Sequence, residues 1–141
     1  MFADTHANTF GWLLDERFAT LDGVECAVLL TTDGMLHSRT SSVSHDAAER
    51  HAAIASSLRG ATHAYSEEFH GGGMRQLLLE LNEYVCLITQ AGPNALLLVQ
   101  TSGPDVDLAA VAHQMSELAV SVGEEMAVEP RTLQPGGQAA G

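Results

Sequence analysis

The chain has 141 residues, 45% of them hydrophobic, and both values fit one globular domain with a single core. It carries 18 acidic and 6 basic residues, which gives a formal net charge of −12. Nucleic acids and anionic membranes are excluded as partners, because both are bound through basic surfaces. All 6 basic residues are arginines, so chemistry that depends on a lysine, such as a P-loop or a Schiff base, is excluded as well.

No apolar run approaches the roughly 20 residues of a membrane-spanning helix. Residues 1–6 contain no arginine or lysine, which argues against a secretory signal. We expect a cytoplasmic protein without direct membrane insertion, one that would reach a membrane only through its partners. Cys26 and Cys86 lie in apolar runs, so we expect buried reduced thiols, with a disulfide between them as the less favoured alternative.

Residues 1–7 are expected to form a flexible tail. A first helix is predicted to start after Asn8 or Thr9 and to end near Leu21, because apolar residues recur at spacings of three and four. Two strand-like runs follow within residues 24–39, joined by an Asp-Gly pair that is typical of a tight hairpin. The first run is apolar and is predicted to lie deep in a sheet, while the second becomes polar, as expected nearer an edge.

A long second helix is predicted from Ser44 or Asp46 to Phe69, with Asp46 and Glu49 arranged as a capping box. Its apolar side is mostly alanine, which would let the helix lie close to a sheet or to a copy of itself. Residues 71–73 are three glycines that would break the helix and reverse the chain. They precede a strand and not a helix, so a hinge is a better interpretation than a phosphate cradle.

Three further strands are predicted at 74–81, 84–90 and 95–101, and their short connections indicate antiparallel neighbours. The third is continuously apolar at its centre and is expected in the middle of the sheet. A last helix is predicted from 107 to 126. Residues 128–141 are rich in proline and glycine and are expected to form a disordered tail.

The expected domain spans residues 8–127 and is of the α/β (α+β) class, with the order helix, two strands, helix, three strands, helix. A five-stranded antiparallel sheet would carry the first and last helices on one face and the long middle helix on the other. The strand at 74–81 would lie at an edge, and it contains no proline. Such an unprotected apolar edge predicts a homodimer, with cover by a loop or tail as the alternative.

Neither a cofactor nor a metal site is predicted. No two of the 7 histidines lie four residues apart, and no Cys-x-x-Cys is present. Residues 38–44, which are rich in serine, precede His45 and Asp46. They resemble a catalytic triad only in composition, because no nucleophile elbow accompanies them.

Several short motifs occur in a fixed order along the chain. They are Trp12-Leu13-Leu14-Asp15, Gly23-Val24, the run from Ala27 to Gly34, the helix segment from Asp46 to Ser56, and the junction from Gly71 to Gln76. In this order and spacing they resemble the Roadblock/dynein-light-chain family, which has a profilin-like fold. The similarity covers residues 8–127 and is closest to the actinobacterial, conservon-type Roadblock proteins associated with a Ras-like GTPase.

The resemblance implies a homodimer in which the strand after the long helix pairs with its copy and the two long helices pack side by side. The interface residues that it implies are Met74, Arg75, Gln76, Leu77, Leu78, Leu79, Ala55 and Leu58. It also implies a non-catalytic regulator or adaptor of a Ras-like small GTPase, either an activator of GTP hydrolysis or a scaffold. A sensor histidine kinase-like protein is the second partner that it implies.

Three alternatives stay open. A small hydrolase or metal-dependent enzyme that uses the histidines would lose its activity when His45 or His63 is replaced by alanine. A dimer that contacts only the sensor kinase would never bind the GTPase. Arg50, Arg59 and Arg75 are candidates by location for an arginine that acts in trans on the GTPase, although surface ion pairs or the dimer strand explain them better.

Overall fold

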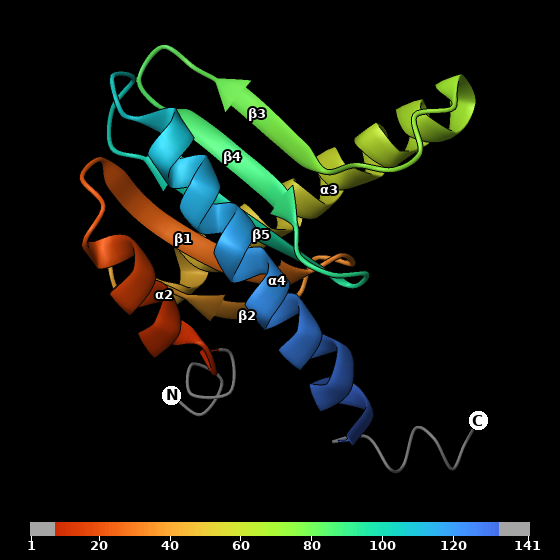
Figure 1. Ribbon diagram of the computed structural model, residues 1–141, viewed down its shortest axis with the longest axis horizontal. Helices are drawn as coiled ribbons and strands as arrows, with labels where there is room; N and C mark the ends of the chain where they lie inside the picture. The colour runs from red at the N-terminus through yellow and green to blue at the C-terminus, as the bar shows by residue number, and fades with distance from the viewer. Residues whose placement is uncertain (1–7, 133–141) are drawn as a thin grey trace.

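The computed structural model describes residues 8–132. Its elements in chain order are α2 (Gly11–Ala19), β1 (Val24–Thr31), β2 (Leu36–Arg39), α3 (His45–Phe69), β3 (Gln76–Glu80), β4 (Val85–Gln90), β5 (Ala95–Thr101) and α4 (Leu108–Thr132) (Figure 1). The predicted order of helices and strands is therefore confirmed. Within the described range, no helix is both long enough and apolar enough to cross a membrane. The tail expected at residues 1–7 lies outside the described residues.

The strands form one antiparallel sheet in the order β2-β1-β5-β4-β3. β1 and β5 occupy its centre, where Val28 lies opposite Leu98 on one face and Leu29 lies opposite Leu97 on the other. All four side chains are at most 3% exposed. Both apolar runs are buried as predicted, because the sheet is covered on its two faces, and β2 and β3 are its edges.

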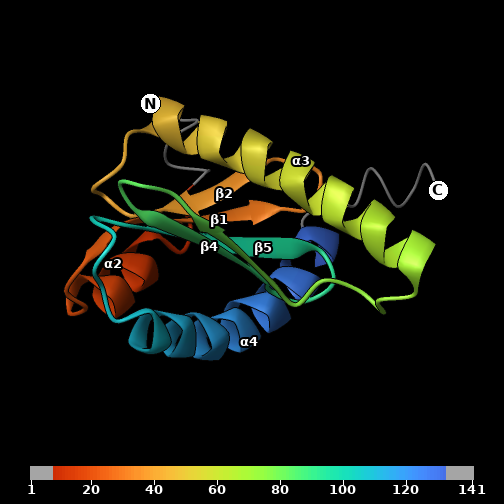
Figure 2. The same cartoon turned by 90° about the horizontal axis from the view of Figure 1, so that it is seen from above.

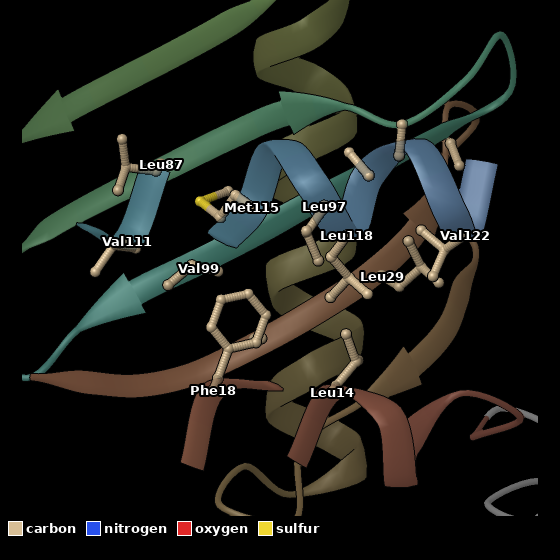
Figure 3. Packing of buried hydrophobic residues seen from close by; sticks show 14 of the residues in the cluster. Leu14, Phe18, Leu29, Leu87, Leu97, Val99, Val111, Met115, Leu118 and Val122 are labelled. Carbon is tan, nitrogen blue, oxygen red and sulfur yellow. The ribbon is translucent and has the colours of Figure 1, made fainter. Parts of the chain in front are cut away.

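The helices form two layers around the sheet (Figure 2). α2 and α4 share one face, where Leu14, Phe18 and Met115 pack against the strands in a single buried cluster (Figure 3). α3 covers the other face alone, and Ala48 and Ala52 are fully buried against a second cluster there. The predicted arrangement of two helices on one face and the long helix on the other is confirmed.

α2 starts later than the apolar spacing predicts. Its N-cap residue is Phe10, which offers no side-chain cap, and the helix ends at Ala19 instead of near Leu21. Asn8, one of the two expected caps, has another partner: its Oδ1 accepts a hydrogen bond from the Arg39 N–H at 2.8 Å. The cap prediction is wrong because an edge strand, distant in sequence, competes for the asparagine side chain.

α3 starts at one of its two predicted positions. Ser44 is the N-cap, and its Oγ accepts a hydrogen bond from the Ala47 N–H at 3.1 Å. The capping box predicted at Asp46 and Glu49 is wrong, because the helix begins one residue before Asp46, at His45, with Ser44 as its N-cap. Glu49 lies one turn into the helix, 3.4 Å from the ring of His45.

The end of α3 depends on glycine, as predicted. His70 caps the helix in the left-handed conformation, with φ at 60°. The Gly71 N–H donates to the Ser66 C=O at 2.8 Å, and a Cβ on Gly71 would lie 2.9 Å from Ser66 Oγ. The glycines therefore let the chain turn back closely along the last turn of the helix.

α4 is longer than predicted. It continues through Pro130 to Thr132, whereas the apolar spacing and the proline favour an end near Met126. The helix therefore includes residues 128–132 of the expected tail, and residues 133–141 lie outside the described range. A proline disfavours a helix without forbidding it, and the alanine and glutamate that precede it are good helix formers.

α4 passes the β4–β5 turn at a glycine. A Cβ on Gly123 would lie 2.9 Å from the backbone of Ala91 and Gly92. We expect Gly123→Ala to lower Tm, because overpacking costs about 1–3 kcal/mol, whereas the gain in helix propensity is at most about 1 kcal/mol. Thermal unfolding followed by circular dichroism measures the change.

The matched control is Gly60→Ala in α3. No atom lies within 4 Å of a Cβ built on Gly60, so this variant gains helix propensity without a clash and should raise Tm. An equal rise in both variants would show that α4 does not approach the turn as closely as described.

Candidate functional site

The edge of the sheet at β2 is covered by the residues that precede α2. The Arg39 N–H donates to Asn8 Oδ1, and the Phe10 N–H donates to Ser38 Oγ, each at 2.8 Å. The Phe10 ring stacks on the His37 ring with 5.3 Å between centroids. Side chains and loop atoms thus occupy the positions that a further strand would need, which closes this edge.

β3 forms the opposite edge, and no strand in the described range pairs with its outer side. The Gln90 N–H donates to the Arg75 C=O at 3.1 Å, and the Leu81 N–H donates to the Tyr84 C=O at 3.0 Å. Because hydrogen-bonded pairs alternate in an antiparallel ladder, the odd-numbered residues of β3 are bonded to β4. The even-numbered residues direct their N–H and C=O groups away from the sheet; these are Gln76, Leu78 and Glu80.

The side chains of β3 alternate between the two faces. Leu77 and Leu79 are half-buried and pack against the cluster under α3. Leu78 lies opposite Leu87, which belongs to the cluster under α2 and α4, and 46% of Leu78 is exposed. β3 therefore combines apolar side chains on both faces with a row of unpaired backbone groups, which is typical of a strand that pairs with another chain.

A groove of about 370 Å³ lies between α3 and the open edge. It exists because α3 packs mainly on β1, β2 and β5 and less closely on β3 and β4. Ile54 and Leu58 of α3 form one wall, and Leu79, Leu81 and Tyr84 of the β3–β4 hairpin form the other. Exposed apolar surface of this kind marks an interaction site.

The predicted interface residues separate into three groups. Residues 76–79 lie in β3, as expected. Met74 and Arg75 precede the strand, which starts two residues later than predicted. Ala55 and Leu58 both line the groove, and Ala55 is itself fully buried.

Three exposed apolar side chains of α3 were missed by the sequence reasoning. Tyr65, Phe69 and Ile54 are 69%, 65% and 62% exposed, respectively. Their spacing is the signal that could have found them, because together with Leu58 and Ala61 they form one stripe at intervals of three and four residues. The alanines of the same helix form a second, buried stripe, and helical spacing alone does not separate the two.

Two thiols and a histidine lie near the floor of the groove. Cys86 and His51 line it, and Cys26 Sγ is 3.9 Å from His51 Nε2. Burial raises the pKa of each thiol to about 11 and lowers the pKa of His51. A thiol with a raised pKa is a poor nucleophile and a poor metal ligand at neutral pH, so the pair is inert.

The thiols are free, as predicted. Cys26 and Cys86 flank Gln100 from the two sides of β5. Their Cα atoms are therefore two strand spacings apart, about 10 Å. A disulfide spans less than about 7 Å between Cα atoms, so this separation excludes the alternative pairing.

The serine-rich loop uses its hydroxyl groups in the fold. Ser42 Oγ donates to the Glu25 C=O at 2.7 Å, and Ser44 caps α3. His45 lies beside Glu49, one turn along the helix. Among residues 8–132, no three His, Cys, Asp or Glu side chains are placed to hold a metal ion together.

A second groove, of about 720 Å³, lies on the opposite face, between α4 and the same edge. Arg75, Gln76 and Val120 line it, and Gln76 Nε2 donates to Thr89 Oγ1 at 3.2 Å. Both grooves therefore end at β3. A strand added to β3 would extend the floor of each groove. The two grooves, which lie on opposite faces of the sheet, therefore meet at this edge.

The comparisons with known proteins agree with this geometry. A family model described as the Roadblock/LC7 domain matches residues 10–101. One Roadblock/LC7 domain structure from Streptomyces avermitilis is 28% identical, with 84% of this chain and 98% of that chain covered and a TM-score of 0.78. Another from the same organism is 31% identical, with 79% and 96% covered and a TM-score of 0.64.

The gliding protein MglB from Thermus thermophilus is 16% identical, with 86% of this chain and 91% of that chain covered and a TM-score of 0.70, a likeness of fold alone. No curated protein matches. The family match begins just before α2 and ends with β5, so it contains the sheet, α3 and the open edge. From the sheet order, the helix layers and this match, the chain belongs to the Roadblock/LC7 domain family.

Proposed function

We propose that the chain is a non-catalytic, homodimeric regulator of a Ras-like small GTPase, acting as an activator of GTP hydrolysis or as an adaptor. One observation carries the proposal: a member of the Roadblock/LC7 family keeps an apolar edge strand with its outer hydrogen-bonding groups unpaired. The GTPase is proposed as a partner because the chain resembles bacterial Roadblock proteins that act with such a GTPase. A sensor histidine kinase-like protein is the second proposed partner.

The homodimer is supported by the contrast between the two edges. β2 is covered by Asn8 and Phe10, whereas β3 is left bare. A two-fold axis beside β3 would pair the strand with its copy and join two sheets into one. One protein of this fold, an MglB that is 18% identical, is described as having a tetrameric arrangement.

The chemistry of the side chains supports a regulator that acts by binding another protein and not by catalysis. Both thiols are buried with raised pKa values, and the serines near His45 hold the fold together. The net charge of −12 per chain doubles in a homodimer and favours a protein partner with a basic surface. These features favour a role in which the exposed apolar surface binds another protein.

GTP hydrolysis by the associated Ras-like GTPase tests the proposal directly. An activator raises the single-turnover rate in proportion to the chain added, and an adaptor leaves the rate unchanged while the two proteins co-purify. Pull-downs of the chain against the GTPase and against the kinase-like protein, run separately, complete the test. Binding to the kinase-like protein alone, with no effect on the GTPase, would contradict the proposal.

Proline at position 78 tests the homodimer. The Leu78 N–H points away from β4, so Leu78→Pro removes a donor that serves only a partner strand. We expect a folded monomer with an unchanged far-ultraviolet circular dichroism spectrum. Sedimentation velocity at micromolar concentration measures the loss of the dimer.

The matched control is Leu77→Pro, which removes a hydrogen bond to β4 within the chain. It should lower Tm, whereas Leu78→Pro should mainly remove the dependence of Tm on protein concentration. If the unchanged protein already sediments as a monomer, pairing through β3 is wrong.

A further inference from the structure

A small pocket, with a volume of about 210 Å³, lies between α2, the start of β1 and the loop that follows β2. Its apolar lining consists of Phe18, Leu21, Val24 and Cys26. Phe18 and Cys26 are each only 3% exposed and form the floor. Pockets that hold a small molecule usually measure at least about 300 Å³. The size therefore suits one inserted side chain better than a whole molecule.

The pocket lies on the side of the molecule away from the open β3 edge. α2 packs on β1 and β2, and in the sheet order β5 and β4 separate β1 from β3. Figure 1 shows α2 beside β1 and β2, with β3 on the opposite side of the sheet. A second chain paired with β3 would therefore leave the pocket open, and a homodimer would carry it twice.

One carboxylate at the pocket is held in place by the loop after β2. Asp15 Oδ1 accepts hydrogen bonds from the Ser41 N–H at 2.9 Å and from Ser41 Oγ at 3.3 Å. Ser42 Oγ donates to the Glu25 C=O and ties the same loop to β1. The other oxygen, Asp15 Oδ2, accepts no hydrogen bond from any residue between 8 and 132. It is available to a donor from outside the chain.

A second carboxylate is placed at the pocket by a β-bulge. Two consecutive residues of β5, 101 and 100, lie opposite Val24 and Cys26, so Glu25 is an extra residue on β1. Bulges re-aim a side chain and are frequent beside functional sites. Glu25 is exposed and lines the pocket. Burial raises the pKa of Cys26, and the charge of Glu25 adds to this rise, as expected for a carboxylate beside the floor.

The negative charge of the pocket is not balanced within the part of the chain that the structure describes. There, neither Asp15 nor Glu25 forms an ion pair, and no arginine or histidine lines the pocket. The sequence contains no lysine at all. An apolar floor with carboxylates at its rim matches a lysine or arginine side chain, whose methylene stem lies on apolar surface while its charged head stays at the polar rim.

An exposed tryptophan borders the pocket on α2. Trp12 is 66% exposed and precedes Asp15 by three residues, so the two side chains are neighbours on the helix surface. The face of a tryptophan ring attracts the charged head of an arginine or lysine. Tryptophan is also enriched among the residues that anchor protein interfaces. Trp12 and the pocket therefore favour the same kind of partner, a protein with a basic surface.

We infer that this pocket receives a lysine or arginine side chain of the Ras-like GTPase. The inference rests on the function proposed above and adds the place where the partner's basic surface binds. The stem of the inserted side chain contacts Phe18, and its charged head donates to Asp15 Oδ2 and to the carboxylate of Glu25. A metal ion matches the pocket poorly, because two carboxylates on an apolar floor supply too few oxygen ligands.

The double variant Asp15→Asn/Glu25→Gln tests the pocket. The asparagine keeps an acceptor for the Ser41 N–H, so the loop stays in place and only the two charges are lost. We expect the Kd for the GTPase to rise at least about tenfold, because hydrogen bonds between charged groups are roughly twice as strong as neutral ones. Isothermal titration calorimetry measures the change.

The matched control is Glu124→Gln/Glu125→Gln. These two residues of α4 are exposed and do not line the pocket. Both double variants lose the same charge, so the long-range attraction of a basic partner falls equally in each. The difference between their Kd values therefore reports the pocket itself. Equal Kd values would overturn the inference.

Replacements on the GTPase identify the inserted side chain. Each surface lysine and arginine of the GTPase is replaced in turn by alanine, and binding is measured with the unchanged chain and with Asp15→Asn/Glu25→Gln. One replacement should weaken binding to the unchanged chain and have no effect on the double variant, because both changes remove the same contact. If every replacement has the same effect on both chains, no basic side chain enters the pocket.

The outcomes separate this inference from the proposed function. GTPase binding that is equally strong in the two double variants overturns the pocket and leaves the regulator intact. A GTPase that does not bind the unchanged chain overturns both. A change of oligomeric state in Asp15→Asn/Glu25→Gln alone, measured by sedimentation velocity, would assign the pocket to an arginine of another copy and would also overturn the inference.

Discussion

The hydrogen-bonding groups on the outer side of β3 are the constraint on which the rest of this molecule depends. Every open sheet has two edges, and each edge carries N–H and C=O groups that need partners. This chain covers the β2 edge from within, with Asn8 and Phe10. It leaves the β3 edge bare and surrounds it with apolar surface, including Leu78 and Leu81, which are about half exposed. Water satisfies the backbone groups but not the leucines, so the edge favours a protein partner.

The composition of α3 explains how one helix serves the core and the surface together. Ala48, Ala52 and Ala55 are fully buried, so the helix lies close to the sheet without large core side chains of its own. The bulky residues then fall on the neighbouring stripe, where Ile54 and Leu58 border the groove. Had the large residues faced the sheet, the helix would stand further away and the stripe beside the edge would be polar. The alanine-rich pattern is thus the reason that α3 has apolar surface left over.

Periodicity predicts most of this fold because the relevant interactions are local. The runs at 24–31 and 95–101 are apolar on both faces, which only a central strand tolerates, and each lies at the centre of the sheet. The edge position of β3 also follows from chain order and loop length. Sequence reasoning fails where a residue has a distant partner: Asn8 binds the edge of β2 and caps no helix.

The strand of the candidate site is also predicted from the local sequence pattern. Strand residues 76–79 follow from alternation, but the exposure of residues 59–69 of α3 does not, because it depends on where the helix crosses the sheet. A stripe at helical spacing predicts an apolar face and says nothing about what lies beneath it. Leu58 and Tyr65 share that face, yet one lines a groove and the other extends past the sheet.

The second half of α3 also connects association to helix stability. An isolated helix shorter than about 12–15 residues is marginal in water, and residues 59–69 pack no apolar side chain into the core of their own chain. Their order therefore depends on the continuous helix before them, on the Ser66 contact with the returning chain, and on whatever covers Tyr65 and Phe69. If a second copy in the proposed homodimer provides that cover, helix order and dimer formation are one equilibrium.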